Sequence, residues 1–173
     1  MTLAIESYDR AAELFAMENQ TSSANQCLAH VAELSSAALS EPDLIRASSI
    51  YDELGRKCLE SNLLKYNAKG YFLQCVLCNL AGNDAVGAGQ SLRKFESLDY
   101  TFGESREGKF ACELVEAVDA FDSEMFATAC FEYDRISKLD PWKTSILVKV
   151  KRGIDGGGDV GGDDPEEDDV DLT

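Results

Sequence analysis

Two cysteines stand at a spacing that proteins use for metal binding and for redox chemistry. Cys75 and Cys78 form a Cys-x-x-Cys pair, which can supply two thiolate ligands to zinc or form a redox-active dithiol. A structural zinc site needs two further ligands in a similar cluster, and none follows in the sequence. A thioredoxin-type pair opens a helix after a strand, whereas this pair lies within a predicted helix. We therefore interpret both cysteines as core residues, and keep a metal or redox protein as the weaker alternative.

The sequence lacks the patterns of common catalytic sites. His30 is the single histidine, so a dyad with a second histidine is impossible, and we interpret it as a helix-surface residue. No glycine-rich phosphate loop, serine–histidine pair or arrangement of paired carboxylates stands out. We predict a protein that is not an enzyme, with no catalytic residues, no metal site and no cofactor.

Charged residues indicate function more clearly. Lys65 and Lys69 are four residues apart, on one edge of a predicted helix, where they form either a solvated stripe or a contact for an acidic partner. Glu113, Glu116 and Asp119 form a spaced acidic patch on a later helix, for which solvation is again the alternative interpretation.

The net charge of −16 is unevenly distributed over the 173 residues. Nine of the 32 acidic residues lie in 153–173, which has no lysine or arginine, so residues 1–152 hold 16 basic against 23 acidic residues. This balance excludes the basic footprint needed to bind nucleic acid and favours a basic protein partner. No apolar run is long enough to span a bilayer and the N-terminus has no signal-peptide pattern, which predicts a cytosolic protein.

Helical periodicity runs through the chain up to residue 152, and no segment shows the two-residue alternation of a strand. The longest apolar stretch, Asn62–Leu80, has two apolar faces, which predicts a helix with neighbours on both sides. Tyr66 and Leu73 lie on one of these faces, and Tyr71 and Cys75 on the other. Turn signals place a loop at Asp99–Glu104. The other predicted helices are Leu3–Met17, Thr21 to about Ala38, Leu44–Leu59, Ala85–Leu98, Ser105–Val118, Asp122 or Ser123 to Lys138, and Trp142–Arg152.

A degenerate repeat supports a stacked arrangement of these helices. A small residue is followed four positions later by an aromatic residue and then an acid, with 43, 44 and 38 residues between successive aromatics. Such periods are typical of helical repeat arrays. The four occurrences are Ala4…Tyr8-Asp9, Ala47…Tyr51-Asp52, Ser91…Phe95-Glu96 and Ala129…Tyr133-Asp134. We predict a helical domain over 1–152 and, because 153–173 has too few apolar residues to order itself, a disordered acidic tail.

Several segments occur in the order and spacing of a known family. They are SSANQCL, SNLLKYNAKGYF, Ser105-Arg106-Glu107, EYDRISKLDPWKTSILVKVK and the terminal DDVDLT. Together they resemble the C-terminal part of the soluble NSF attachment proteins, the SNAP adaptors of α type. The resemblance runs from about Ala4 to Arg152 and resumes at the last residues. It implies an all-α fold of TPR-like antiparallel helical hairpins in a right-handed α-α superhelix, which ends in a C-terminal helical bundle.

The resemblance also implies a function and two partners. These adaptors coat the syntaxin-containing SNARE four-helix bundle and recruit and stimulate the AAA+ ATPase NSF, which disassembles the bundle for vesicle fusion and intracellular transport. They are cytoplasmic and reach membranes peripherally, through SNARE complexes. The alternative is a generic TPR-like scaffold for another partner.

The residues that match the family's binding positions fall into two charged groups. Lys65, Lys69 and Arg106 match basic, SNARE-facing positions, whereas His30 and Gln26 stand where lysines occur and weaken that face. The NSF-facing group is acidic, although Ala120 replaces one acid, and Leu172 matches the residue associated with stimulation of ATP hydrolysis. This group comprises Glu116, Asp119, Asp168, Asp169, Asp171 and Leu172.

Members of this family are longer than this chain and begin with hairpins that carry a membrane-touching loop. The sequence is therefore expected to be either a fragment or a short form. A short form would keep the NSF-facing end and lose part of the SNARE and membrane contacts.

Overall fold

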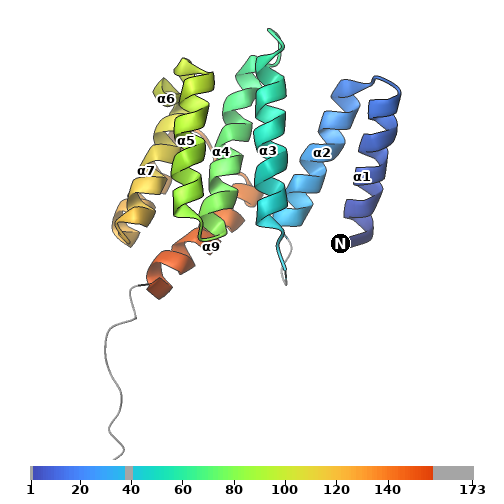
Figure 1. The fold of residues 1–173 in the computed structure, drawn as a ribbon. Helices are drawn as coiled ribbons and strands as arrows, with labels where there is room; N and C mark the ends of the chain where they lie inside the picture. Colours follow the sequence, from blue (N-terminus) through green and yellow to red (C-terminus); the bar gives the residue numbers. More distant parts are fainter. Residues whose placement is uncertain (1, 38–40, 158–173) are drawn as a thin grey trace, which may run out of the picture.

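The computed structural model describes residues 2–37 and 41–157, and within them it contains nine helices and no strand (Figure 1). The prediction of an all-α chain is confirmed. The helices are α1 (Thr2–Met17), α2 (Thr21–Ser36), α3 (Leu44–Leu59), α4 (Lys65–Ala81), α5 (Ala85–Leu98), α6 (Tyr100–Glu104), α7 (Arg106–Asp119), α8 (Ser123–Ile136) and α9 (Pro141–Gly157).

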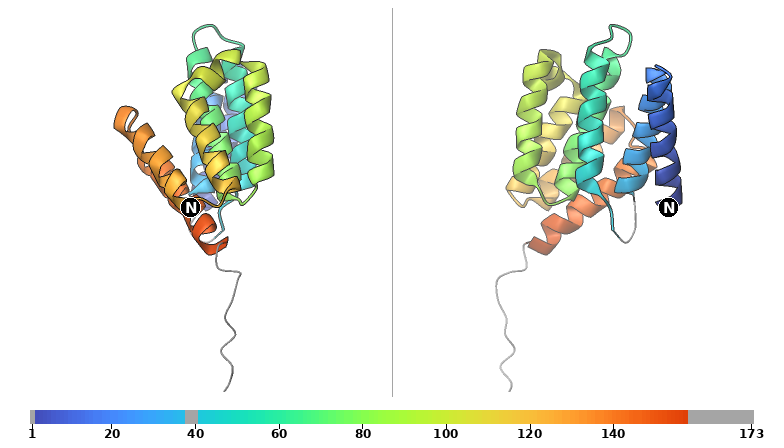
Figure 2. Two further views of the ribbon diagram at one scale, coloured as in Figure 1. Left: turned by 90° about the vertical axis from the view of Figure 1, so that its left-hand side faces the viewer. Right: turned by 45° about the vertical axis from the view of Figure 1, so that its right-hand side comes forward.

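Consecutive helices form antiparallel hairpins that stack side by side (Figures 1 and 2). Helix α1 packs on α2, α2 on α3, α3 on α4, and α4 on α5. Helix α7 continues the row beside α5 and α4, and α8 packs on α7. This arrangement confirms the predicted TPR-like array of helical hairpins.

Three predicted boundaries are wrong. The segment Asp99–Glu104 is not a loop but contains the short helix α6, because the Asp99 carboxylate caps the Thr101 N–H at 2.9 Å and Phe102 is fully buried. Helix α4 begins at Lys65, after a turn at residues 62–64, rather than at Asn62. Helix α9 continues past Arg152 to Gly157, since Ile154 is a buried apolar residue of its last turns.

Smaller differences affect other helix ends. Helix α7 runs from Arg106 to Asp119 with Ser105 as its N-cap, and α8 ends at Ile136 rather than Lys138. Helix α2 ends at Ser36, and the predicted end near Ala38 lies outside the described residues, as does the tail from residue 158 onward.

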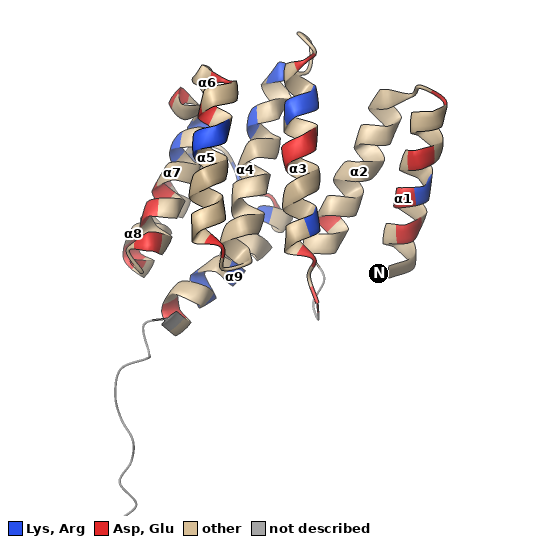
Figure 3. Cartoon of the chain, in the orientation of Figure 1, with Lys and Arg blue, Asp and Glu red and all other residues tan. Residues whose placement is uncertain are grey.

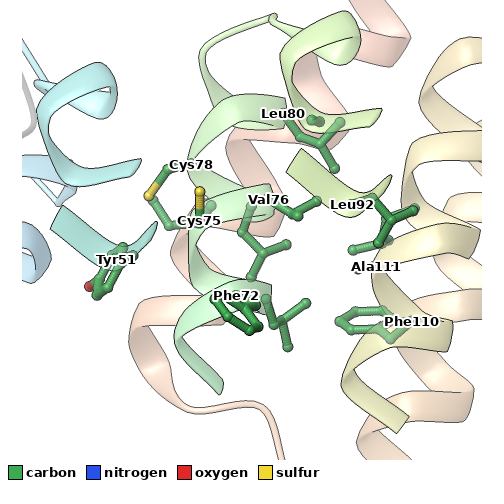
Figure 4. Close-up of a cluster of buried hydrophobic side chains, with 14 of the residues drawn as sticks. Tyr51, Phe72, Cys75, Val76, Cys78, Leu80, Leu92, Phe110 and Ala111 are labelled. Carbon is green, nitrogen blue, oxygen red and sulfur yellow. The ribbon is translucent and has the colours of Figure 1, made fainter. Parts of the chain in front are cut away.

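Helix α4 is the centre of the core, packed against α3, α5, α7 and α9. Its Phe72 is fully buried, stacks on Phe95 with ring centroids 4.1 Å apart, and meets the edge of Phe102. Gly55 of α3 allows this approach, because a Cβ atom there would lie 2.4 Å from the Phe72 ring. The predicted neighbours on both faces of this helix are therefore present, with side chains interdigitating as in Figure 4. Tyr66 is an exception, since its side chain is exposed in the first turn.

The repeat carries an ion pair from one hairpin to the next. Asp9 of α1 pairs with Arg46 of α3 at 2.6 Å, and Asp52 of α3 pairs with Lys94 of α5 at 2.9 Å. Each acid follows the repeat aromatic directly, and each base lies on the first helix of the next hairpin. Both bases are largely in contact with solvent and both acids are partly buried, and ion pairs near the surface contribute little to stability.

Three hairpin turns share one geometry. Asn19, Asn83 and Phe121 have positive φ angles of 60°, 58° and 51° and follow α1, α4 and α7. In each turn the next residue donates its N–H to a carbonyl five residues earlier, as in Asp122 N–H to Ala117 O at 2.9 Å. This is the Schellman motif, whose left-handed position favours glycine and tolerates asparagine. Phenylalanine at that position is unusual.

Helix α9 does not extend the row but crosses it obliquely, packing on α4 and α8 (Figure 2). Its Trp142 is buried and donates its indole N–H to Ser36 Oγ of α2 at 2.9 Å. Lys149 Nζ donates to the Ser36 carbonyl at 3.0 Å. The edge of the Trp142 ring meets Tyr51, whose buried hydroxyl has no hydrogen-bond partner among the described residues. Helix α9 thus joins the second helix of the array to its last.

Candidate functional site

Lys65 and Lys69 lie together at one end of the array. They line an open groove of about 470 Å³ between the start of α4 and the end of α5, where Figure 3 shows basic residues on α3, α4 and α5. The other lining residues are Leu59, Tyr66, Leu98, Asp99, Tyr100 and Thr101. We refer to this region as the basic groove.

The two lysines keep their charge available to a partner. Within the described residues no carboxylate lies within 4 Å of either ammonium group, whereas Lys57 and Lys94 at the same end pair with Glu53 and Asp52. The Lys65 ammonium lies 5.8 Å from the centre of the Tyr66 ring. Asp99, the acid of the groove, is already engaged, because it accepts hydrogen bonds from the N–H and hydroxyl of Thr101.

Helix α4 adds to the positive potential of the basic groove. Its first turn contains no acidic residue, and Leu64 at the N-cap position offers no side-chain hydrogen bond. The N-terminal end of a helix carries partial positive charge, and here the Lys65 and Asn67 N–H groups already donate to the Ser61 and Leu64 carbonyls at 3.0 and 2.8 Å. A helix start with two lysines and no acid is unfavourable for the helix alone, so the arrangement favours an anionic partner.

Arg106 is separate from the two lysines. It opens α7, does not line the basic groove, and donates from Nη1 to the Ser137 hydroxyl at 3.0 Å. The structure therefore brings together two of the three predicted basic residues.

The acidic residues Glu116 and Asp119 lie near the C-terminal end of α7, and both are exposed. The Glu116 carboxylate accepts a hydrogen bond from the Cys112 thiol at 3.4 Å, and together with burial this raises the pKa of that thiol to about 11. Asp119 lines a second groove, described below. Asp168, Asp169, Asp171 and Leu172 lie outside the described residues.

Cys75 and Cys78 are buried among apolar side chains of α4 (Figure 4). Burial raises the pKa of Cys75 to about 12 and raises that of Cys78 as well, so both remain protonated thiols, which are poor metal ligands and nucleophiles. Among residues 2–37 and 41–157, no three Cys, His, Asp or Glu side chains gather as they would around a metal ion. His30 is exposed beside Tyr8 and Glu33.

Two aromatic features were not predicted as parts of a site. Tyr66 and Tyr100 flank the basic groove and are 75% and 87% exposed. The sequence pattern predicts Tyr66 on an apolar face and Tyr100 in a loop. Phe121 falls between two predicted helices, and its sequence neighbourhood gives no sign of the backbone geometry that it adopts.

None of the helices in the described part of the chain combines the length and the apolar composition needed to cross a bilayer.

Comparison with known proteins gives one family. Residues 1–155 match the family described as "Soluble NSF attachment protein, SNAP". A vesicular-fusion protein of Coprinopsis cinerea is 43% identical over 154 residues, which cover 89% of this chain and 52% of that protein. The alpha-soluble NSF attachment proteins of Vitis vinifera and Homo sapiens are each 38% identical, covering 87% and 88% of this chain and 51% and 50% of their own length. The chain thus spans about half the length of the relatives it matches.

Proposed function

Because the chain belongs to the soluble NSF attachment protein family, we propose that it is a non-enzymatic adaptor that binds SNARE complexes and recruits and stimulates an NSF-type ATPase. The observation that carries this proposal is the separation of charge on one rigid array. Lys65 and Lys69, which have no ion-pair partner among the described residues, line a groove at one end of the array. Exposed acids lie at the opposite end, on α7, and the acidic tail follows α9.

The basic groove is the proposed SNARE-facing surface. Lys65 and Lys69 supply two cations that face solvent, and Tyr66 and Tyr100 supply exposed aromatic surface beside them. An acidic helical bundle would be attracted by the lysines over about 8 Å at physiological ionic strength. Arg106, at the start of α7, would form a secondary contact rather than part of the same groove.

The acidic surface is the proposed ATPase-facing side. Glu116 and Asp119 are exposed near the end of α7, and residues 158–173, which follow α9, would add Asp168, Asp169 and Asp171. Leu172 is proposed to act on the ATPase cycle.

The adaptor would be cytoplasmic and would reach membranes only through the SNARE complexes that it binds. The names of the relatives refer to NSF attachment and to vesicular fusion, which supports a role at membranes that fuse.

Co-sedimentation with an NSF-type ATPase, with and without assembled SNARE complex, tests the proposal. We expect the full chain to bring the ATPase to the SNARE complex and to bind each partner with an affinity that falls as salt is raised. A chain that binds neither partner would instead support a scaffold for another protein.

The role of the tail is tested by Leu172→Ala, with Val170→Ala as the matched control. We expect Leu172→Ala to abolish stimulation of ATP hydrolysis while circular dichroism stays unchanged, and Val170→Ala to keep the stimulation. Equal stimulation by both variants would exclude a specific role for Leu172.

A further inference from the structure

A second groove, with an apolar lining, lies at the end of the array opposite to the basic groove. It has a volume of about 270 Å³ and is formed where the ends of α4 and α7 meet the start of α5 and the last turns of α9. Its apolar lining residues are Leu80, Ala85, Val118, Phe121, Val150 and Ile154. Pockets for small molecules usually measure roughly 300–1,000 Å³, so this groove suits one or two side chains of a protein partner better than a metabolite.

Phe121 forms one wall of this groove and is out of place by two ordinary criteria. Its backbone is left-handed, with φ of 51°, where the equivalent turns use Asn19 and Asn83. A bulky residue is disfavoured in that conformation because its Cβ crowds the backbone. Its ring is also 65% exposed, so burial in the core does not explain it. Phe121 instead lines the groove together with Leu80 and Ile154, both of which are buried.

Acidic side chains border the groove at the turns before α5 and α8, whereas Lys151 and Arg152 are exposed on the α9 side, next to the lining residues Val150 and Gly153. Asp119 is the charged residue among its lining residues, which include no lysine or arginine. Asp84 and Asp122 are exposed and lie at the two turns that border the groove. Each carboxylate also accepts a hydrogen bond from a backbone N–H in the first turn of the helix that follows it. Figure 3 shows acidic residues gathered on the same ends of α7 and α8. The acids at the ends of α4 and α7 therefore favour a partner that carries positive charge on that side of any apolar group that enters the groove.

We propose that this groove receives an apolar side chain from a basic segment of a protein partner, with Phe121 as its contact wall. The inference rests on the proposed function, because Asp119 belongs to the surface proposed to face the ATPase. The occupant is then an aliphatic or aromatic side chain flanked by lysine or arginine on that ATPase. Interfaces are commonly dominated by a few aromatic contacts in an apolar pocket, with charged groups around them.

The test is Phe121→Asn in the full chain. Asparagine suits the left-handed position, so the melting temperature should stay equal or rise. We expect the affinity for the ATPase to fall at least tenfold at every salt concentration, with an unchanged dependence of affinity on salt. Asp119→Asn should also lower the affinity, but it should flatten the salt dependence because it removes a charge. The matched control is Phe131→Asn on α8, since Phe131 is also 65% exposed but does not line the groove.

The same variants are measured against a short synthetic peptide of alternating lysine and leucine, which carries the proposed chemistry without the ATPase. An affinity of Phe121→Asn equal to that of the unchanged chain would overturn the inference, and so would equal losses in Phe121→Asn and Phe131→Asn. Peptide binding that depends on Phe121, in a chain that does not bind the ATPase, would retain the groove and reject the proposed function. Peptide binding that is independent of Phe121 would reject the groove.

Discussion

The two grooves lie at opposite ends of one helix and differ in how they present charge. Lys65 and Lys69 occupy the first turns of α4, and Leu80 occupies its last turn, roughly 22 Å from Lys65 and roughly 17 Å from Lys69 along the helix at about 1.5 Å per residue. The basic groove is larger and contains two exposed tyrosines and two lysines that form no ion pair within residues 2–37 and 41–157. The second groove is smaller and apolar, with carboxylates at its border.

This difference shows how one array can serve two partners. The middle of α4 is buried between α3, α5 and α7, so both grooves depend on the same packed core. They share no lining residue. Substitutions in the core should therefore weaken binding at both grooves, and substitutions at one end should weaken binding at that groove alone.

The largest effect is expected from Phe72→Ala, which removes the ring that packs on Phe95 and Phe102. Replacing a buried phenylalanine by alanine costs about 3–5 kcal/mol of unfolding free energy. Denaturant unfolding should show this loss, and binding at both grooves should weaken together. Val86→Ala, at an exposed position of α5, is the control and should change stability by less than about 0.5 kcal/mol. Full binding at one groove in the Phe72 variant would show that the two grooves do not depend on the same packed core.

A change confined to one end is the double variant Lys65→Glu, Lys69→Glu. Reversing two exposed charges should lower the affinity for the SNARE complex at least tenfold at low salt, with a smaller difference at high salt. Binding of the ATPase should stay unchanged. Lys151→Glu with Arg152→Glu is the control, because these two exposed residues of α9 reverse the same number of charges outside the basic groove. Salt-independent SNARE binding in the Lys65 and Lys69 variant would reduce the pair to solvated surface.

A smaller effect is expected from Trp142→Phe, which keeps an aromatic ring beside Tyr51 but removes the hydrogen bond to Ser36. Loss of one such bond costs about 0.5–1.5 kcal/mol. Because Val150 and Ile154 of the same helix line the second groove, ATPase binding should weaken more than SNARE binding. Combining the variant with Ser36→Ala should give less than the sum of the two single losses. Strict additivity would mean that the bond contributes nothing.

The smallest effect is expected from Tyr51→Phe. The Tyr51 hydroxyl is buried without a partner among the described residues, and burial raises its pKa. Removing an unsatisfied hydroxyl should leave the unfolding free energy within about 0.5 kcal/mol or raise it slightly, with both grooves unaffected. A loss above about 1 kcal/mol would reveal a partner for this group, such as a buried water.

The helices were predictable because their signals are local. Proline after Asp140, the acid at Asp84 and the spacing of apolar residues mark helix starts and faces without knowledge of the fold. The repeat of small, aromatic and acidic residues also predicted the stacking of hairpins. The short helix α6 was missed because its stability depends on burial of Phe102 against Phe72 and Phe95, which belong to other helices.

The site was only partly predictable for the same reason. The spacing of Lys65 and Lys69 predicted that they lie on one edge of a helix, as a solvated stripe or as a contact, whereas Arg106 could not be placed relative to them without the structure. Tyr100 enters the basic groove only because α5 returns beside the start of α4. The groove at Phe121 depends on four helices and a left-handed turn, and no short sequence pattern encodes such a site.

Helix α9 has a consequence for how the array responds to force. Repeat arrays in which each unit contacts only its neighbours unfold one unit at a time from an end. Here the last helix packs on α4 and is hydrogen-bonded to α2 through Trp142 and Lys149. Tension applied at Gly157 would therefore be spread over the centre and the second helix of the row at once, instead of peeling away the final hairpin. A force on α9 would therefore be carried by α2 and α4 together.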